Sequence, residues 1–325
     1  MKKKKVSILV AAYNVEETIS QTIQSILEQT YDNIEIIVVN DGSTDNTENA
    51  LKIFMDDILV INKDNQGLGS ARNSGLEKAS GEFVMFMDGD DYFAYRNVVE
   101  DLVNLSEEDN AELVVADFNY VDSNGKVISK RKVQSEIESM YSGAWNKLYV
   151  RSLWSKKRFP ENILYEDSGI IMSIGLAANK ISVLHKPIYS YRQGGGTITQ
   201  SLDSPNRHLD SIKGLEPYIN MVSKLEDVQT KESAIHYINH ILLGHAIVVK
   251  VEYNSSDQQV MVLSQLLQYM GNPLLRKGGF SNQFISDKVQ RVTFKLLKTE
   301  NLRLFLNVLL NFAIKVRNRK RNKRG

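Results

Sequence analysis

Three carboxylates stand within four positions at Asp88, Asp90 and Asp91, directly after the apolar run 83–87. Two carboxylates about 4 Å apart repel by roughly 4 kcal/mol at an effective dielectric near 20, so a folded site that gathers three of them normally supplies a cation or a proton. No lysine or arginine lies between these acids and Arg96. The run therefore predicts a cation site. A solvated turn built on Asp-Gly is the alternative.

Polar clusters follow three further apolar runs, at residues 13–14, 40–43 and 65–67. Open α/β sheets bind ligands at the carboxyl ends of their strands. If the apolar runs are parallel strands, four loops converge on one edge of the sheet. This convergence favours a functional role for the acidic run over a solvated turn.

The elements that must position these loops alternate along the chain. The apolar runs VSILVAA, IEIIVVN, DILVIN and EFVMFM are separated by helical periodicity at 16–29, 45–55 and 68–79. Continuous apolar strands between helices are typical of a parallel sheet covered on both faces. The pattern predicts a doubly wound, mostly parallel α/β domain. It continues with a helix at 96–106, a strand at 111–121 and a strand-loop-helix region at 147–178.

The pattern becomes helical throughout after about residue 204, so we predict one domain at 1–204 and a helical C-terminal region at 205–325. Within that region, residues 300–316 place six apolar side chains on one stripe, and a basic tail follows. This combination predicts a helix in a membrane interface with its tail on anionic lipid. Packing on the first domain and self-association into a homo-oligomer are the alternatives.

Composition limits the protein class. The chain has 325 residues, 42% hydrophobic and 24% charged, which is typical of a globular protein. The absence of cysteine excludes disulfides and thiol nucleophiles and favours a reducing cytoplasm. The net charge of +1 hides eleven cations at residues 2–5 and 315–325, so the remainder carries about −10. No apolar stretch reaches about 18 residues. We expect a cytoplasmic protein, peripheral on the inner face of the cell membrane.

Five motifs occur in the order SILVAAYNVEETI, VVNDGSTDNT, NQGLGSARNSGLEKASGEFVMFMDGDD, AWNKLY and YEDSGI. Together they resemble the bacterial family 2 inverting glycosyltransferases of the Rossmann-like GT-A fold, which build capsular, extracellular or cell-wall glycans. The resemblance covers roughly residues 5–195. One departure is Ala11, where the family commonly has proline. The resemblance implies metal-dependent, non-processive transfer of a sugar from a nucleotide-sugar, taken as UDP-linked, to a hydroxyl of a surface polysaccharide or glycolipid.

The resemblance assigns the nucleotide to the first two loops. It implies that Tyr13 stacks on the base, that Glu16 lies close to base or ribose, and that Asp41 accepts from the imide N–H of uracil. Tyr13 capping the sheet edge is an alternative. For Asp41 the alternative is an N-cap of a helix that begins near Ser43.

The resemblance also assigns the acidic run. It implies that Asp88 lies near the ribose or the metal, and that Asp90 binds a divalent cation, Mn²⁺ or Mg²⁺, between the two phosphates. Asp91 supports this site or contacts the donor sugar. Carboxylate and phosphate oxygens suit such hard cations.

The motif YEDSGI corresponds to the base motif of the family, with Asp167 as the general base and Glu166 beside it. Two acids in the first turn of a helix, where the helix dipole favours them, are the alternative. Arg72 either faces the donor or pairs with the acidic loop. Trp145 either packs on an acceptor sugar or is a buried core residue. Arg192, in the loop 191–196, either joins the metal as part of a lid or belongs to a plain connection.

Several other functions are excluded or kept as rivals. The run GLGSAR lacks the third glycine of a dinucleotide loop and the lysine of a Walker loop, and no nucleic-acid partner is expected. His236 and His240 have i, i+4 spacing, but helix packing explains them better than a metal pair. A nucleotidyltransferase acting on a sugar phosphate remains one rival, although it usually has a Gly-rich basic loop where this chain has AAYNVEE. A catalytically inactive nucleotide-sugar-binding scaffold is the other.

Overall fold

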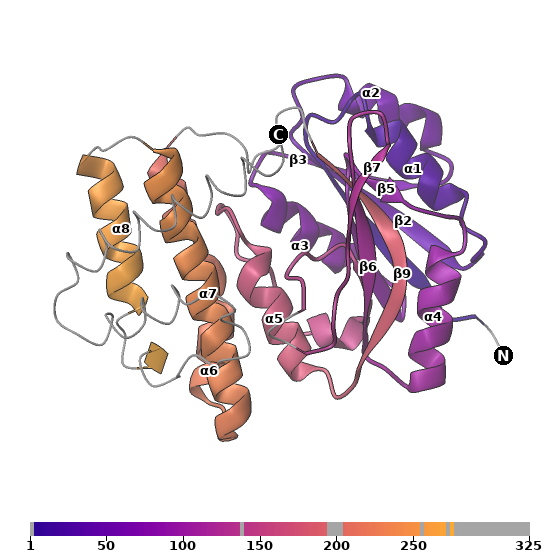
Figure 1. The fold of residues 1–325 in the computed structure, drawn as a ribbon. Helices are drawn as coiled ribbons and strands as arrows, with labels where there is room; N and C mark the ends of the chain where they lie inside the picture. The colour runs from indigo at the N-terminus through magenta and orange to yellow at the C-terminus, as the bar shows by residue number, and fades with distance from the viewer. Residues whose placement is uncertain (1–2, 137–139, 194–203, 254–256, 271–273, 276–325) are drawn as a thin grey trace. The chain divides into compact units, whose positions relative to one another are not determined.

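The computed structural model describes residues 3–136, 140–193, 204–253, 257–270 and 274–275. The chain divides into two units, Met1–Ser201 and Leu202–Gly325 (Figure 1). The boundary predicted near residue 204 stays a prediction, because residues 194–203 lie outside the described residues.

The first half of the N-terminal unit is a parallel sheet. Its strands run in the order β3-β2-β1-β4. They are β1 (Val6–Ala12), β2 (Ile34–Asp41), β3 (Leu59–Lys63) and β4 (Phe83–Asp88). All of β1 is buried, because helices cover both faces of the sheet. Figure 1 shows α1 (Ile19–Leu27) on one face and α3 (Leu68–Lys78) on the other. The short helix α2 (Thr47–Leu51) links β2 to β3. The predicted doubly wound architecture is confirmed.

The second half of the sheet mixes strand directions. Its strands are β5 (Tyr92–Phe93), β6 (Leu113–Val121), β7 (Val127–Arg131), β8 (Lys147–Val150) and β9 (Ile181–Arg192). β6 and β9 are parallel, whereas β8 runs antiparallel to both of its neighbours, β4 and β6. The helices are α4 (Val98–Asp109) and α5 (Asp167–Ala177). The strand of the predicted region 147–178 is β8, whereas β5 and β7 show too little alternation to be assigned from sequence.

The acidic run forms a tight turn held against the end of β1. The amide of Gly89 donates to the carbonyl of Ala11 at 2.9 Å, and a Cβ on Gly89 would lie 2.9 Å from the same oxygen. The hydroxyl of Thr22, buried in α1, reaches the carbonyl oxygens of Gly89 at 2.9 Å and Asp91 at 2.7 Å. Thus α1 and β1 fix the backbone of this turn, and only glycine fits at position 89.

The C-terminal unit is helical wherever it is described, as predicted. A 3-10 helix at Pro205–Leu209 precedes α6 (Asp210–Ser223), α7 (Val228–Glu252) and α8 (Asp257–Met270). Asp227 caps α7 by accepting the backbone N–H of Thr230 at 2.7 Å. None of the helices in the described part of the chain combines the length and hydrophobicity that a membrane crossing requires. The predicted interfacial helix at 300–316 and its basic tail lie outside the described residues.

Candidate active site

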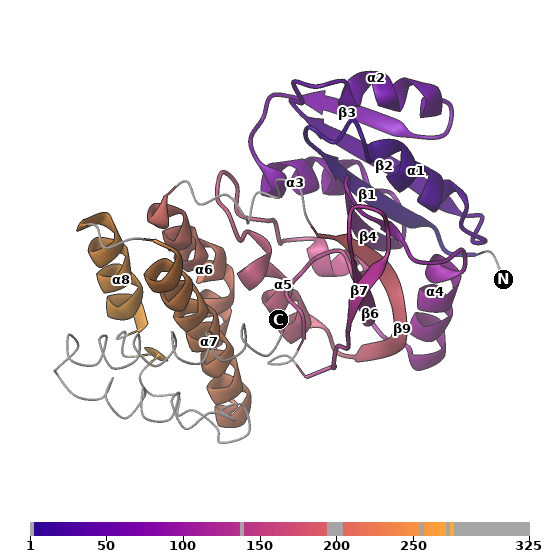
Figure 2. The same ribbon diagram turned by 45° about the horizontal axis from the view of Figure 1, so that its top comes forward.

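The loops after β1, β2, β3 and β4 meet at one edge of the sheet (Figure 2). Strand register places Asp88 beside Ala11, and Asn40 beside Ala12. On the other side of β2, Asp41 pairs with Lys63. The parallel topology therefore brings polar residues that are far apart in sequence into neighbouring positions.

The Asp91 side chain connects the acidic loop to strand β9. Its side chain is buried, and it accepts hydrogen bonds from the Tyr189 hydroxyl at 2.8 Å and from the backbone N–H of Arg192 at 2.7 Å. Burial, and then the charges of Asp90 and Asp88, raise the pKa of Asp91 well above its usual value. Because both carboxylate oxygens have partners within the protein, Asp91 ties β9 to the loop. This arrangement fits the predicted supporting role better than contact with a donor sugar.

Asp90 has a different environment. Among the described residues, no side chain donates a hydrogen bond to the Asp90 carboxylate. The backbone N–H of Asp90 itself interacts with it, and the Arg192 guanidinium reaches only the Asp90 backbone carbonyl, at 2.7 Å. Burial and then the charge of Asp88 raise the pKa of Asp90 to about 6. A half-buried carboxylate with no partner among the described side chains fits a hard cation.

The donor set suits Mg²⁺ or Mn²⁺ bound jointly with a ligand. Within the described residues, no three acidic, histidine or cysteine side chains form a cage for a metal ion. Mg²⁺ is usually held by one or two carboxylates plus phosphates and water, and such a site needs no cage made by the protein alone. Asp90 and the partly exposed Asp88 would be the two carboxylates of such a site.

Arg72 connects the acidic loop to the predicted base motif. Its guanidinium is buried and donates to Asp88 Oδ1 at 2.8 Å and to Glu166 Oε1 at 2.5 Å. Burial alone lowers the pKa of Arg72, but the charges of Asp88 and Glu166 outweigh this effect and raise it. Of the two predicted alternatives, the structure shows the pairing with the acidic loop. It also adds a partner, Glu166, that the sequence did not reveal.

Arg72→Met is expected to lower the free energy of unfolding by about 3–5 kcal/mol, because it leaves Glu166 buried without its counter-charge. Urea denaturation measures this change. Arg158→Met is the matched control, since the described contacts of Arg158 are to the backbone carbonyls of Trp154 and Lys157, and it should cost much less. A loss below about 1 kcal/mol for Arg72→Met would show that the buried pair is not needed.

Glu166 and Asp167 begin α5, with Glu166 at the N-cap position. The Glu166 side chain makes no capping hydrogen bond, and no described residue donates to the Asp167 carboxylate. Burial, and then the neighbouring charge of Glu166, raise the pKa of Asp167 to about 7, although Arg72 opposes the shift. Burial likewise raises the pKa of Glu166. Carboxyl groups placed only to stabilise a helix N-terminus would be held as anions, so this environment favours a general base.

One face of α3 fixes the loop that leads to Asp167. Asn73 Nδ2 donates to the carbonyl of Phe159 at 2.9 Å, and Asn73 Oδ1 accepts the N–H of Phe159 at 2.9 Å. One turn earlier, Gly69 lies so close that an added Cβ would be 2.2 Å from the carbonyl oxygen of Pro160. Arg72 reaches Glu166 from the same helix. Sequence reasoning missed Gly69 and Asn73, although the spacing 69, 72, 73 is the i, i+3, i+4 signal of one helix face.

Gly69→Ala is therefore expected to destabilise the fold by about 1–3 kcal/mol, because the methyl group and the Pro160 carbonyl occupy the same space. The loop must also shift, which displaces Asp167 and lowers the rate of sugar transfer. Urea denaturation and a transfer assay measure the two effects. Ser74→Ala in the same helix is the control and should change both much less; equal effects from the two substitutions would contradict this packing argument.

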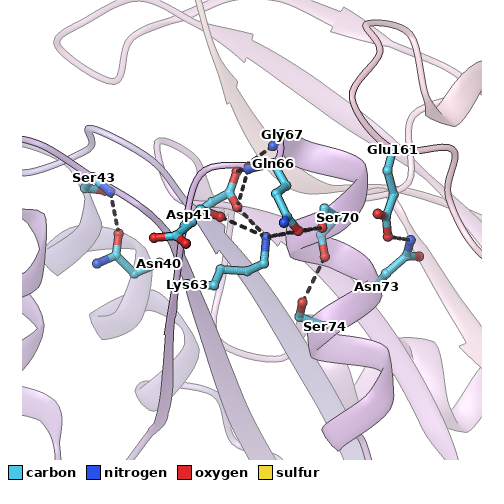
Figure 3. A network of polar contacts seen from close by, with 11 residues as sticks. Asn40, Asp41, Ser43, Lys63, Gln66, Gly67, Ser70, Asn73, Ser74 and Glu161 are labelled. Atoms are coloured by element: carbon cyan, nitrogen blue, oxygen red, sulfur yellow. Dashed lines mark hydrogen bonds and ion pairs between the residues drawn. The ribbon is translucent and has the colours of Figure 1, made fainter.

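Asp41 lies at the centre of the polar network in Figure 3. It pairs with Lys63 at 2.9 Å and accepts the backbone N–H groups of Gln66 and Gly67, the latter at 2.8 Å. The predicted alternative, an N-cap near Ser43, is wrong: Asn40 accepts the N–H of Ser43, and Asp41 serves the start of α3 instead. These three donors occupy most of the roughly four acceptor sites of the carboxylate, which leaves little capacity for a uracil N–H.

Tyr13 and Glu16 lie on the loop after β1. The Tyr13 side chain is 43% exposed, which suits a stacking surface and not a cap buried under the sheet edge. Glu16 Oε2 accepts the backbone N–H of Asn46 at 2.7 Å, so in this structure it joins the first two loops together. Their predicted contacts with base and ribose stay predictions.

Trp145 is buried, with 3% of its surface exposed. Its ring stacks on Tyr189 at 4.3 Å and on Tyr191 at 5.2 Å between centroids. The structure thus shows the buried alternative, and the side chain offers little face to an acceptor sugar. Its contribution is to pack the strand that carries Arg192.

Lys147 is a buried lysine that sequence reasoning did not single out. Its ammonium donates to the carbonyls of Tyr141 and Gly143 and to Asn146 Oδ1, each at 2.6 Å. Burial lowers its pKa to about 7, and the charge of Asp167 opposes this shift. These three bonds hold the loop that precedes β8. No spacing signal marks a lysine whose acceptors are mostly backbone carbonyls.

The sequence profile described as Glycosyl transferase family 2 matches residues 7–174. The chain belongs to glycosyl transferase family 2. Glycosyltransferase GlyA of Streptococcus pneumoniae is 34% identical over 60% of this chain and 32% of GlyA. EpsH of Bacillus subtilis is 35% identical over 60% of this chain and 62% of EpsH. The chain thus spans less than two thirds of either relative.

Solved structures of similar fold include S. aureus TarS 1-349 in complex with UDP-GlcNAc. It has a TM-score of 0.74 and 22% identity, covering 95% of this chain and 91% of that chain. Mannosyltransferase PcManGT of Pyrobaculum calidifontis, in complex with GDP-Man and Mn²⁺, has a TM-score of 0.54 and 14% identity, covering 98% and 87%. The fold is the GT-A fold, and the family is the one that the five motifs indicated.

Proposed function

We propose that this protein is an inverting, metal-dependent, non-processive glycosyltransferase. It transfers a sugar from a nucleotide-sugar, a UDP-sugar, to a hydroxyl of a surface polysaccharide or lipid-linked glycan. The observation that carries the proposal is the link that Arg72 makes between the acidic loop and the start of α5, through Asp88 at 2.8 Å and Glu166 at 2.5 Å. Asp90 and Asp167 are the sequence neighbours of these two partners, and burial raises the pKa of Asp90 to about 6 and that of Asp167 to about 7.

Donor binding begins at the first three loops. Tyr13 offers an exposed ring at the sheet edge for the base, and Asp41 with Lys63 fixes the loop that opens α3. TarS, of similar fold, is solved with UDP-GlcNAc, which supports a uridine donor for this chain. Asp88 and Asp90 would hold the cation that the donor diphosphate requires. When bound, that cation neutralises charge on the departing nucleoside diphosphate.

Asp167 removes the proton from the attacking acceptor hydroxyl. A base works best when its pKa lies near the operating pH, and about 7 meets this condition. Glu166 and Arg72 set this value in opposite directions, since Glu166 raises the pKa of Asp167 and Arg72 lowers it. One displacement with one base inverts the anomeric carbon, so an α-linked donor gives a β-linked product.

The protein is further proposed to act at the inner face of the cell membrane, where a lipid-linked acceptor is presented. The support is the amphipathic stripe at 300–316 and the seven cations of residues 315–325. Each such cation adds about 1 kcal/mol of attraction near an anionic surface. Self-association through the same stripe is the competing proposal.

A nucleotide-sugar panel tests the donor assignment. Uridine donors with Mn²⁺ should raise the melting temperature of the full chain by several degrees, and the rise should shrink in EDTA, because a ligand that binds only the native state stabilises it. Thermal-shift measurements with uridine, guanosine and thymidine donors check this. Stabilisation by guanosine or thymidine donors alone would overturn the roles given to Tyr13 and Asp41.

A further inference from the structure

A basic hairpin, residues 122–132, stands beside the acidic loop. It consists of the turn 122–126 and the strand β7, which hydrogen-bonds to β6 only. Every residue from 126 to 132 is exposed. Four of these seven residues are cations and none is acidic; the cations are Lys126, Lys130, Arg131 and Lys132. Val127 and Ile128 add two exposed apolar side chains.

These cations exceed what an edge strand needs. Lysine on an exposed edge blocks unwanted strand pairing, and this function alone is the simplest explanation. Another edge strand, β3, has no such run: its one cation, Lys63, pairs with Asp41, and Asp57 and Asp64 flank the strand. Within the described residues, no acid pairs with any of the four hairpin cations. Four like charges close together therefore lack a counter-charge, which an anionic partner would supply.

The turn of the hairpin touches the proposed donor site. Arg192 Nη1 lies 3.4 Å from the carbonyl oxygen of Ser123, while its Nε donates to the carbonyl of Asp90 at 2.7 Å. The Asp122 carboxylate accepts two backbone N–H groups of the turn at 2.9 Å each, which fixes its shape. The Arg192 side chain thus contacts both the hairpin and the loop proposed to hold the cation. A chain bound along β7 ends next to the reaction centre.

We propose that the basic hairpin binds the acceptor, and that this acceptor is an anionic glycan with phosphate or carboxylate groups along its chain. The four cations contact those groups, and the exposed Val127 and Ile128 contact ring carbons. This inference rests on the proposed function, because it names the acceptor class for the same site. An anionic lipid surface is the rival occupant, and the experiment separates the two.

The test compares three full-length proteins: wild type, the hairpin variant K126Q/K130Q/R131Q/K132Q, and the control variant K52Q/K78Q/K156Q/K224Q. The control removes the same charge from exposed lysines elsewhere. The probes are phosphorylated dextran, unmodified dextran of the same length, and phosphatidylglycerol vesicles. Wild type and control should bind phosphorylated dextran about tenfold or more tightly than dextran at low salt, and the preference should fade as salt rises. The hairpin variant should lose most of that preference and keep its melting temperature.

Two results for the hairpin variant would overturn the inference. One is an unchanged preference for phosphorylated dextran in the hairpin variant. The other is a loss of vesicle binding in that variant while its glycan binding remains. UDP binding with Mn²⁺ is measured on the same proteins. If the wild type fails to bind UDP, the proposed function and the acceptor role fall together, whereas intact UDP binding without a glycan preference removes the inference alone.

Discussion

Asp167→Asn is expected to lower the rate of sugar transfer by about 10²–10⁴-fold, because the amide cannot accept the proton of the acceptor hydroxyl. The Kd for the donor should change little, since the proposed donor contacts lie on other loops. UDP release is measured with the donor and acceptor that give the wild type its highest rate. The wild-type rate should rise with pH through about 7, the pKa of the Asp167 carboxyl.

Asp101→Asn is the matched control, since Asp101 is also an acid in the first turn of a helix, α4. It should leave transfer unchanged. Wild-type turnover by Asp167→Asn would remove the role of general base and favour the inactive-scaffold alternative.

The same substitution is expected to stabilise the fold at pH 8. The folded-state pKa of Asp167 lies above its unfolded value, so its contribution to stability falls as pH rises from about 4 to about 7. Asparagine removes that penalty, which is on the order of a few kcal/mol, while the lost helix-dipole attraction is about 0.3–1 kcal/mol. The melting temperature of Asp167→Asn should exceed that of the wild type at pH 8 and approach it at pH 4. A lower melting temperature at pH 8 would favour the helix-terminus explanation of this acid.

Asp90→Asn is expected to reduce transfer by about 10²–10³-fold, the size of effect seen when one preorganised electrostatic contact to the transition state is lost. Asparagine keeps the shape but removes the charge that attracts a cation. Its melting temperature should stay the same or rise, because burial raises the pKa of Asp90 and no hydrogen bond from another side chain to its carboxylate is lost.

Asp91→Asn provides the contrast, since Asp91 binds Tyr189 and the backbone of Arg192. It should lower the melting temperature clearly. Full activity of Asp90→Asn would contradict the cation site and favour the alternative that the acidic run is only a solvated turn.

The sequence was sufficient for the parallel half of the sheet and for the position of the acidic run. Long apolar strands and the turn chemistry of Asp88 to Asp91 are local signals. The convergence of loops then followed from the parallel topology. Strands β5, β7 and β9 were not assigned, because their direction and register depend on partners distant in sequence.

The contacts of several site side chains could be assigned only from the structure. Arg72 was equally compatible with a donor contact and an ion pair, and only the position of Glu166, 94 residues later, decides between them. Trp145 and Lys147 are adjacent to a polar residue in sequence, but both are buried in the structure. Trp145 stacks on Tyr189, and Lys147 donates to backbone carbonyls. Asp41 was predicted to accept from uracil or to cap a helix near Ser43, and the sequence did not reveal that the 63–67 loop supplies it with two backbone N–H donors.

The central claim is that Asp88 and Asp90 hold a divalent cation that binds the diphosphate of the donor. Titration calorimetry of UDP into the full-length wild type and into Asp90→Asn, each with Mn²⁺ and with EDTA, tests it most directly. We predict that Mn²⁺ tightens UDP binding by about tenfold or more in the wild type and that this gain disappears in Asp90→Asn. Equal affinity with Mn²⁺ and with EDTA in the wild type, or an undiminished gain in Asp90→Asn, would contradict the account.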